Sequence, residues 1–471
     1  MNARVRWLVA GAFLPSPSGE RFPGTADSFA ERLGRAARGL SVAVPDRIGS
    51  GGADAVRAVS IRALHDFTLD AVAGASADLR ALLAVYEALS GGGLYGAGEA
   101  AGLKSIQDSG RLAAALAEAL RDVRSPADAR RAALAVLEEA LFATARDVLQ
   151  HPTVAGLESA WRGLHWLQEY CPPSSGIDLE ILDVAPRQLL DALARCLDSD
   201  PLQRPDACFI LDPCDDLETL QQLAVLGEQS FLPTVVALPP SLANQAEANP
   251  TEEWTRLRGH ESSRWLCATL NPVVAMVEHR GAVRRECFTS PVLAVAVLLA
   301  ASLRDTGTFA RAVGPGSPTR APSAWPAREG STVATQAHLS LRELERLAAR
   351  GIAGVSGWWD SDAVQAVALP TVYGGRDSAP LPAQVLTGRL VRLIQELAGK
   401  LPAGAGPEAV TSLFSRAAEV FIPSGPQGGC RLQAKMMSGA GGARAVQVRA
   451  WLRPELAGTP LQLELAISLE S

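Results

Sequence analysis

The stretch HPTVAGLESAWRGLHWL, residues 151–167, predicts a helix that is central to the fold. Pro152 suits a first helical turn, because the N–H that proline lacks would have no partner there. Large apolar side chains recur every three or four residues, which places them on one helical face. The side chains that we expect this face to bury are Leu157, Trp161, Leu164 and Trp166. We interpret His151 as the residue that closes one helix, starting at Pro126, and opens the next.

Downstream of this helix, apolar runs typical of buried strands alternate with amphipathic segments typical of helices. In chain order these segments are 179–184, 185–197, 208–211, 217–226 and 234–238. Their β–α–β–α–β order predicts a parallel sheet flanked by helices. We expect a loop at 315–330, which holds four prolines, and helices at 339–350 and 386–401. The apolar run 291–303 is too short to cross a bilayer and predicts a buried core helix.

The tail of the chain has a period-two pattern, which is typical of antiparallel strands with one buried face. Segments 431–437, 445–453 and 461–469 alternate apolar and polar residues, and SGAGGA at 438–443 is the expected hairpin connection. The apolar positions that we single out are Val446, Val448, Leu452, Leu461, Leu463, Leu465, Ile467 and Leu469. They suit pairing between protomers, and the alternative is an ordinary sheet edge covered by its own chain.

The first 95 residues predict a small α/β unit of their own. We expect strands at 7–14, 41–44 and 56–64, a helix at 27–40, and one further helix from Asp66 or Thr68 to Leu89. The sequence therefore predicts an α/β (α+β) protein in which this small unit packs on a larger α/β core. The regions are 1–95, a helical connector at 96–130, the core at 131–430 and C-terminal strands at 431–471.

Composition excludes several classes of function. The chain has 471 residues, which predicts two or three domains, and its net charge of −6 gives no electrostatic footprint for nucleic acid. Seven cysteines without a CxxC pair argue against a disulfide framework and fit the cytoplasm. Arg4 and Arg6 before WLVAGAFL mimic a short signal peptide, but this run also fits a buried first strand, which we favour. We expect no direct insertion into a membrane.

Motifs of catalysis are missing from the sequence. There is no phosphate-binding loop, no GxSxG and no HExxH, and the six histidines lack ligand spacing, so we expect no cofactor, no metal and no enzyme activity. Asp212 and Asp215 follow a predicted strand end, where α/β enzymes place their sites. We favour a solvated loop there. An α/β enzyme that uses Asp212, Asp215 or His165 is the remaining alternative from another functional class.

Several stretches resemble, in order, the large sheath subunit of the type VI secretion system (TssC, also VipB or EvpB). Residues 151–167 are similar to its pattern HHPEFQxLEaxWRGLhyL, and residues 251–272 to a stretch with W-x-x-x-R before an E-D-S-R-Y-like run. The matching positions are Glu158, Trp161, Arg162, Gly163, Leu164, Trp254, Arg258, Glu261, Ser263 and Arg264. Residues 339–352 and 448–469 resemble its acidic helix and its closing strands.

The first 95 residues resemble the small sheath subunit (TssB, also VipA). Residues 64–89 are similar to its D-F-x-P-D-x-V helix, with Asp66 and Phe67 among the matching positions. The chain thus looks like both subunits joined head to tail. It departs from the family in starting almost at the second strand of the small subunit, and in matching weakly at 96–130 and at 281–330.

The resemblance implies a structural protomer of a contractile sheath, which assembles helically around an inner tube and drives it by contraction. The implied partners are further copies of this chain, separate sheath subunits, the inner-tube protein, the baseplate and a disassembly AAA+ ATPase. The departures motivate an alternative, a non-polymerising assembly or baseplate factor built on the same fold.

Overall fold

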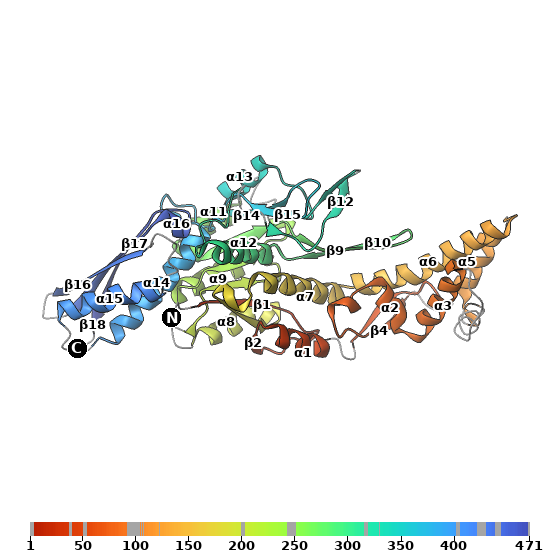
Figure 1. Cartoon of the computed structure of the whole chain (residues 1–471), viewed down its shortest axis with the longest axis horizontal. Coiled ribbons are helices and arrows are strands. Elements are labelled where there is room, and N and C mark those ends of the chain that lie inside the picture. Colours follow the sequence, from red (N-terminus) through yellow and green to blue (C-terminus); the bar gives the residue numbers. More distant parts are fainter. Residues whose placement is uncertain are drawn as a thin grey trace.

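The computed structural model shows an elongated α/β molecule with a central body, a helical arm at one end and a β-sheet unit at the other (Figure 1). It describes residues 4–469 except 37–39, 50–53, 92–103, 105, 107, 122, 199–202, 243–250, 315–318, 329, 402–405, 422–429 and 439–443. The expected hairpin connection at 438–443 therefore falls, apart from Ser438, outside the described residues. The predicted α/β class is confirmed.

The body is built on a nine-stranded sheet in the order β11-β15-β14-β8-β7-β6-β1-β5-β2. In that order the strands are Thr319–Arg320, Ala363–Ala366, Ile352–Gly357, Leu266–Leu270, Thr234–Ala237, Ala207–Ile210, Val5–Gly11, Ile177–Asp183 and Arg21–Pro23. The six strands from β14 to β5 run parallel, as predicted, and the strands at the two ends are antiparallel to their neighbours. The first strand, β1, lies between β5 and β6, which follow it in the chain by more than 160 residues.

Helices cover both faces of this sheet. Trp7, Val9 and Phe209 on one face pack in a single core cluster with α7 (Pro152–Tyr170) and α12 (Pro291–Thr306). Leu8 and Ala10 on the other face pack in a second cluster with four other helices. These are α8 (Leu189–Leu197), α9 (Leu217–Ser230), α11 (Glu252–Gly259) and α13 (Leu341–Ala349). Such burial of both faces explains why β6, β7 and β14 are buried at every position.

The arm is mainly helical and carries most of the predicted small unit (Figure 1). It comprises β3 (Leu40–Pro45), β4 (Asp54–Val59), α2 (Leu69–Ala75), α3 (Ala77–Gly91), α5 (Gly110–Leu120) and α6 (Pro126–Gln150). The hairpin of β9 (Val273–Arg280) and β10 (Val283–Thr289) lies along it and contacts α6. Helix α1 (Ala26–Ala36) stays at the body, where Phe29 packs edge-on against Trp161.

The opposite end is the tail unit, which we define as α14 (Leu381–Gly399), α15 (Pro407–Phe421), α16 (Pro454–Ala457) and a three-stranded antiparallel sheet. Its strands, β16 (Cys430–Ser438), β17 (Arg444–Leu452) and β18 (Leu461–Leu469), follow the predicted period-two pattern closely. The apolar face packs on α14 and α15, and the polar face is open to solvent.

Two sequence predictions about the arm were wrong in detail. Strand β4 ends at Val59 instead of residue 64, because the Asp66 carboxylate accepts the N–H groups of Arg62 and Ala63 and closes the 3₁₀ turn η1 (Leu64–Asp66). The single helix expected up to Leu89 is two helices, α2 and α3, because Ser76 between them is extended.

The expected loop at 315–330 also proved partly ordered into strands. It contributes β11 and the strand β12 (Trp325–Arg328), which pairs with β13 (Ser331–Val333). The Trp325 indole donates to the carbonyl of Thr335 and so fixes the β12–β13 hairpin. Among the described residues, three further short 3₁₀ segments connect the larger elements: Pro173–Ser175, Pro186–Gln188 and Glu261–Trp265.

Candidate functional sites

Trp161 lies at the centre of the body core, as predicted. Its side chain is fully buried on α7, and its indole N–H donates to the Phe13 carbonyl at 2.8 Å. Phe13 and Phe29 contact the ring edge-on, at centroid distances of 5.5 and 4.9 Å. Leu157, Leu164 and Trp166 are buried on the same helix. The tryptophan thus joins the segment after β1 and helix α1 to α7, which is a packing role.

Glu158 and Arg162 of the same motif form a buried charge network with Arg285 of β10. The Glu158 carboxylate accepts from Arg162 Nε at 2.7 Å and from both Nη atoms of Arg285. Glu278 of β9 also pairs with Arg285, so two carboxylates face two guanidinium groups. Burial lowers the pKa of Arg285, but the attraction of Glu158 and Glu278 outweighs it and leaves the pKa raised. We call these four residues the charge hub.

The charge hub binds the segment of the arm that connects β4 to α2. Arg162 donates to the carbonyl oxygens of Leu64 and Phe67, and Arg285 donates to Phe67 at 2.9 Å. Glu278 accepts the Leu69 N–H at 2.8 Å, at the start of α2. The matching positions of the two resemblances therefore meet in space, since Phe67 comes from the small-subunit stretch and Arg162 from the large-subunit stretch.

Gly163 permits the close approach of α7 to α12. A Cβ at this position would clash with Oγ1 of Thr289 and Cδ1 of Leu293. Thr289 Oγ1 donates to the Ser159 carbonyl of α7 at 3.1 Å. The small residue in the WRGL motif is thus required by a helix contact.

The second stretch, 251–272, forms an independent cluster on the other sheet face. Trp254 is buried and donates to the Arg350 carbonyl, and Arg258 donates to the carbonyls of Ala349 and Val372. Arg264 pairs with Glu261 and Asp377 and stacks on Tyr373. Arg258 thus joins α11 to the end of α13 and to Val372, and Arg264 joins surface charges at Glu261 and Asp377. Any sheath role of these matching positions stays a prediction.

A third charged cluster joins the tail unit to the body and was missed by sequence reasoning. Asp206, at the start of β6, pairs with Arg389 at 2.7 Å and Arg392 at 2.6 Å, both from α14 and both buried. Asp206 also accepts the Arg6 N–H of β1. Burial lowers the pKa of Arg392, and Asp206 opposes this effect. The only signal in the sequence was the pair of arginines one helical turn apart in an apolar helix.

The tail sheet has two outer strand edges, one on β16 and one on β18. The sheet order β16-β17-β18 gives neither edge a partner strand among the described residues. Both strands are nine residues long, and Leu461, Leu463, Leu465 and Ile467 on β18 are half-buried. Val446, Val448 and Leu452 on the central strand are buried. Leu469 pairs with Arg444 at the strand end. Long unpaired edges are templates for strand addition.

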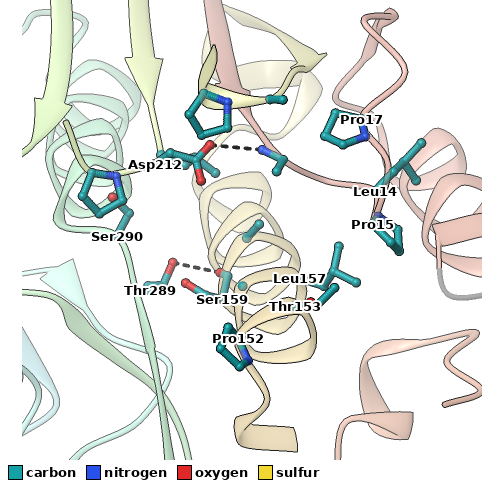
Figure 2. Close-up of a pocket in the computed structure, with 17 residues that line it drawn as sticks. Leu14, Pro15, Pro17, Pro152, Thr153, Leu157, Ser159, Asp212, Thr289 and Ser290 are labelled. Carbon is teal, nitrogen blue, oxygen red and sulfur yellow. Dashed lines mark hydrogen bonds between the residues drawn. The ribbon is translucent and has the colours of Figure 1, made fainter. Parts of the chain in front are cut away.

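A groove runs over the carboxyl ends of the parallel strands, where the chain order reverses between β1 and β6. Such reversal points are the usual ligand sites of open α/β sheets. The groove consists of two pockets of about 400 and 410 Å³ that share Ser159, Leu211, Pro213, Thr289 and Ser290. Figure 2 shows the first pocket, with Pro15 and Pro17 on one wall, the start of α7 below and Ser290 on the opposite wall.

Asp212 is the single ionisable residue among the described residues that line this groove. Its carboxylate accepts the N–H of Ala12 at 3.2 Å (Figure 2). Burial raises the pKa of Asp212, and the Ala12 N–H acts in the opposite direction. Asp183, at the end of β5, is completely buried and accepts three N–H groups and the Ser18 hydroxyl. Asp183 therefore folds the loop after β1, whereas Asp212 retains acceptor capacity.

The groove does not collect the other residues of the enzyme alternative. Asp215 is exposed and lines neither pocket. His165 is half-exposed on α7, where it contacts Phe29 and pairs with Glu169. His151 caps α7 by accepting the Thr153 N–H, as its position between two helices predicted. No group of three potential metal ligands occurs in the part of the chain that the structure describes.

Comparisons with known proteins give little further information. No protein-family model matches the chain, and no curated protein is significantly similar to it. Among solved structures, a chain of the "anti-feeding prophage (AFP) baseplate, 6-fold symmetrised" is similar over 65% of this chain and 77% of its own length. The identity is 9% and the TM-score 0.34, which supports no argument about fold or function. Over the described ranges, every helix is too short or too polar to cross a bilayer.

Proposed function

We propose that this chain is a structural protomer of a contractile sheath of the type VI secretion kind. The observation that carries the proposal is the tail sheet, whose β16 and β18 each present a nine-residue edge without a partner strand among the described residues. An edge of this length can pair with a strand of a neighbouring protomer through main-chain hydrogen bonds. The ordered sequence resemblance supplies the identity of the assembly.

The charged clusters suit a protomer that transmits force. Asp206 holds α14 to β1 and β6, and α14 in turn packs on β18. A load applied to a paired β18 would therefore reach the body sheet through buried ion pairs and packed helices. Contraction needs two packings of such rigid units that differ by roughly a few kcal/mol per protomer. No bond-making step is required, and we expect no catalytic site and no cofactor.

The proposal carries the partners and location that the family resemblance implies. The protomer would bind further copies of itself or separate sheath subunits, surround an inner-tube protein and dock on a baseplate in the cytoplasm. Open helical assembly needs a heterologous contact, in which one surface binds a different surface of the next copy. The tail unit and the arm lie at opposite ends of the molecule, and so they offer two such surfaces (Figure 1).

Electron microscopy of the purified chain tests this proposal, with and without co-expression of the inner-tube protein as a template. Tubes or rings are expected. Only monodisperse particles under both conditions and at several salt concentrations would contradict a sheath role and favour the non-polymerising assembly factor.

A pair of proline variants tests the β18 edge itself. Neighbouring residues of an edge strand point their N–H groups in opposite directions, so Leu465→Pro and Ala466→Pro remove one inward and one outward N–H between them. The variant that removes the outward N–H should keep its melting temperature and lose assembly. If both variants assemble as the unmodified chain does, β18 is not the interface.

A further inference from the structure

The groove over the carboxyl edge has the length of an extended peptide. Its lining residues follow β5, β1, β6, β7 and β8, which are successive neighbours in the sheet. Strands lie about 4.8 Å apart, so the groove extends over roughly 19 Å. An extended chain rises about 3.3 Å per residue, so roughly six residues would fit. The two pockets share five residues and therefore form one continuous surface.

Proline rings and small apolar side chains make up most of the groove. Nine prolines line it, among them Pro15, Pro152, Pro239 and Pro272. Proline has no N–H to donate, so these residues offer a ligand apolar ring contact and carbonyl acceptors but no backbone donor. A ligand with several apolar side chains fits such a surface better than a polar metabolite does.

The groove carries its negative charge at one position, Asp212. Asp212 is the one ionisable group among its described lining residues, and a single N–H, from Ala12, satisfies part of its carboxylate. Asp183, at the end of β5, accepts four hydrogen bonds from the loop after β1, which is the arrangement of a structural carboxylate. Burial already raises the pKa of Asp212, and a cation beside it would oppose that effect.

The start of α12 offers one hydrogen-bond donor to the same groove. Ser290 caps this helix without a side-chain hydrogen bond, and its buried Oγ has no partner among the described residues. Pro291 has no N–H and the Leu293 N–H donates to the Ser290 carbonyl, so the Ser290 hydroxyl is the donor that seeks an acceptor. A carbonyl oxygen of a peptide can supply that acceptor, whereas a simple alkylamine has none. A peptide therefore satisfies both Asp212 and Ser290.

We propose that this groove binds an extended peptide segment of a partner protein, in which one lysine or arginine between apolar residues pairs with Asp212. The apolar flanks lie on the prolines, and the peptide carbonyls face Ser290 at the start of α12. The site is separate from the tail sheet. The inference does not depend on the sheath proposal, because it is tested on the unassembled chain.

Fluorescence anisotropy of the full chain with labelled hexapeptide mixtures tests the inference. Three mixtures carry Ala, Val, Leu and Pro at five positions and differ at the third, which is lysine, norleucine or glutamate. Norleucine keeps the alkyl chain of lysine and lacks the ammonium group. The variants are Asp212→Asn and, as the matched control on the same loop, Asp215→Asn. Thermal melting verifies that both variants fold.

The lysine mixture should bind saturably, with affinity about ten- to hundredfold above that of the norleucine mixture, the scale of one hydrogen bond to a charged group. Asp212→Asn should remove this preference, and Asp215→Asn should retain it. Equal binding of all three mixtures, no binding, or an unchanged preference in Asp212→Asn overturns the proposal.

Two competitors separate the other possible occupants. Hexylamine that displaces the probe as well as an unlabelled lysine peptide does would assign the groove to small amphiphilic amines and overturn the peptide proposal. Dimers of the chain in sedimentation that dissociate when the lysine peptide is added would make the occupant a second copy and overturn the partner-peptide proposal. Loss of probe binding leaves tube formation unaffected, so failure here and failure of the sheath proposal are distinguishable.

Discussion

Two carboxylates near helix α7 lie in contrasting surroundings. Glu158, on the helix itself, is 1% exposed and faces two arginines, Arg162 and Arg285. Asp212, across the groove from the first turns of the helix, is only partly buried and accepts one N–H. Burial of a charge is tolerated in proteins when partners neutralise it. The charge hub therefore pairs its charges within the chain, whereas Asp212 keeps the acceptor capacity on which our peptide proposal rests.

The largest effect is expected when the charge hub is broken. Arg285→Met removes the cation that Glu158 and Glu278 share, and leaving buried carboxylates short of a partner should cost about 3–5 kcal/mol of unfolding free energy. The control is Arg284→Met, whose exposed side chain pairs with Glu286 on the hairpin surface and should cost under about 1 kcal/mol. Urea unfolding measures both. Equal losses of unfolding free energy in the two variants would show that the charge hub does not hold the arm to the body.

Two glycines of α7 extend the comparison, because Gly163 lies against Thr289 and Leu293 and Gly156 lines the groove. Gly163→Ala should destabilise the chain by about 1–3 kcal/mol, because the new methyl group meets Thr289 and Leu293. A Cβ at Gly156 would have no other atom within 4 Å, so Gly156→Ala should stabilise the chain by about 0.5–1 kcal/mol through helix propensity. Thermal unfolding of the pair should give opposite signs. A loss in both variants would place Gly156 in a packed contact.

Asp212→Asn should stabilise the protein at neutral pH. Burial raises the pKa of the folded-state carboxyl above that of the unfolded chain. The contribution of this group to stability is therefore full below the unfolded value, near pH 3.9, and falls as pH rises through the folded value. Asparagine mimics the protonated carboxyl, so the variant should melt higher at pH 7.

The same gain should vanish toward pH 3, where the carboxyl is protonated in the folded and the unfolded chain alike. Calorimetry over this pH range, with the exposed Asp215→Asn as control, measures the difference. A lower melting temperature for Asp212→Asn at pH 7 would make Asp212 a structural residue like Asp183 and would remove the contrast with Glu158.

The smallest effect is expected for a carboxylate in solvent. Glu464 on the open face of the tail sheet pairs with Arg449 at 3.1 Å, and both side chains are nearly half exposed. Glu464→Gln should cost under about 1 kcal/mol, and 1 M salt should abolish the difference by screening. Chemical unfolding at low and high salt gives the measurement. A larger cost that persists in salt would indicate that the tail sheet is buried by self-association.

Local patterns in the sequence predicted much of the fold. The apolar alternation of 461–469 became β18, the run 291–303 became the buried helix α12, and Pro152 after His151 marked the boundary of α6 and α7. These features depend on neighbours in the chain, whose spacing is visible in the sequence. The predicted region boundaries at 95, 130 and 430 stay predictions.

The rest depends on contacts between residues far apart in the chain. Arg285 meets Glu158 across 127 residues, and Asp206 meets Arg389 across 183, so neither pair leaves a periodic pattern. The turn at Asp66 was missed because a carboxylate accepting two N–H groups overrode the apolar run before it. The groove was invisible for the same reason, although Asp212 was singled out at a strand end. Neither Asp215 nor His165 lines the groove.

The position of β1 constrains how the chain is made. Translation delivers this apolar strand well before its two neighbours, since β5 begins 166 residues and β6 196 residues after β1 ends. At synthesis rates of about 5–20 residues per second, the strand waits for β5 for roughly 8–30 s. During that interval its hydrophobic side chains lack their final neighbours and are open to non-native contacts. Aggregation during synthesis is therefore a hazard that pairing with β5 and β6 removes.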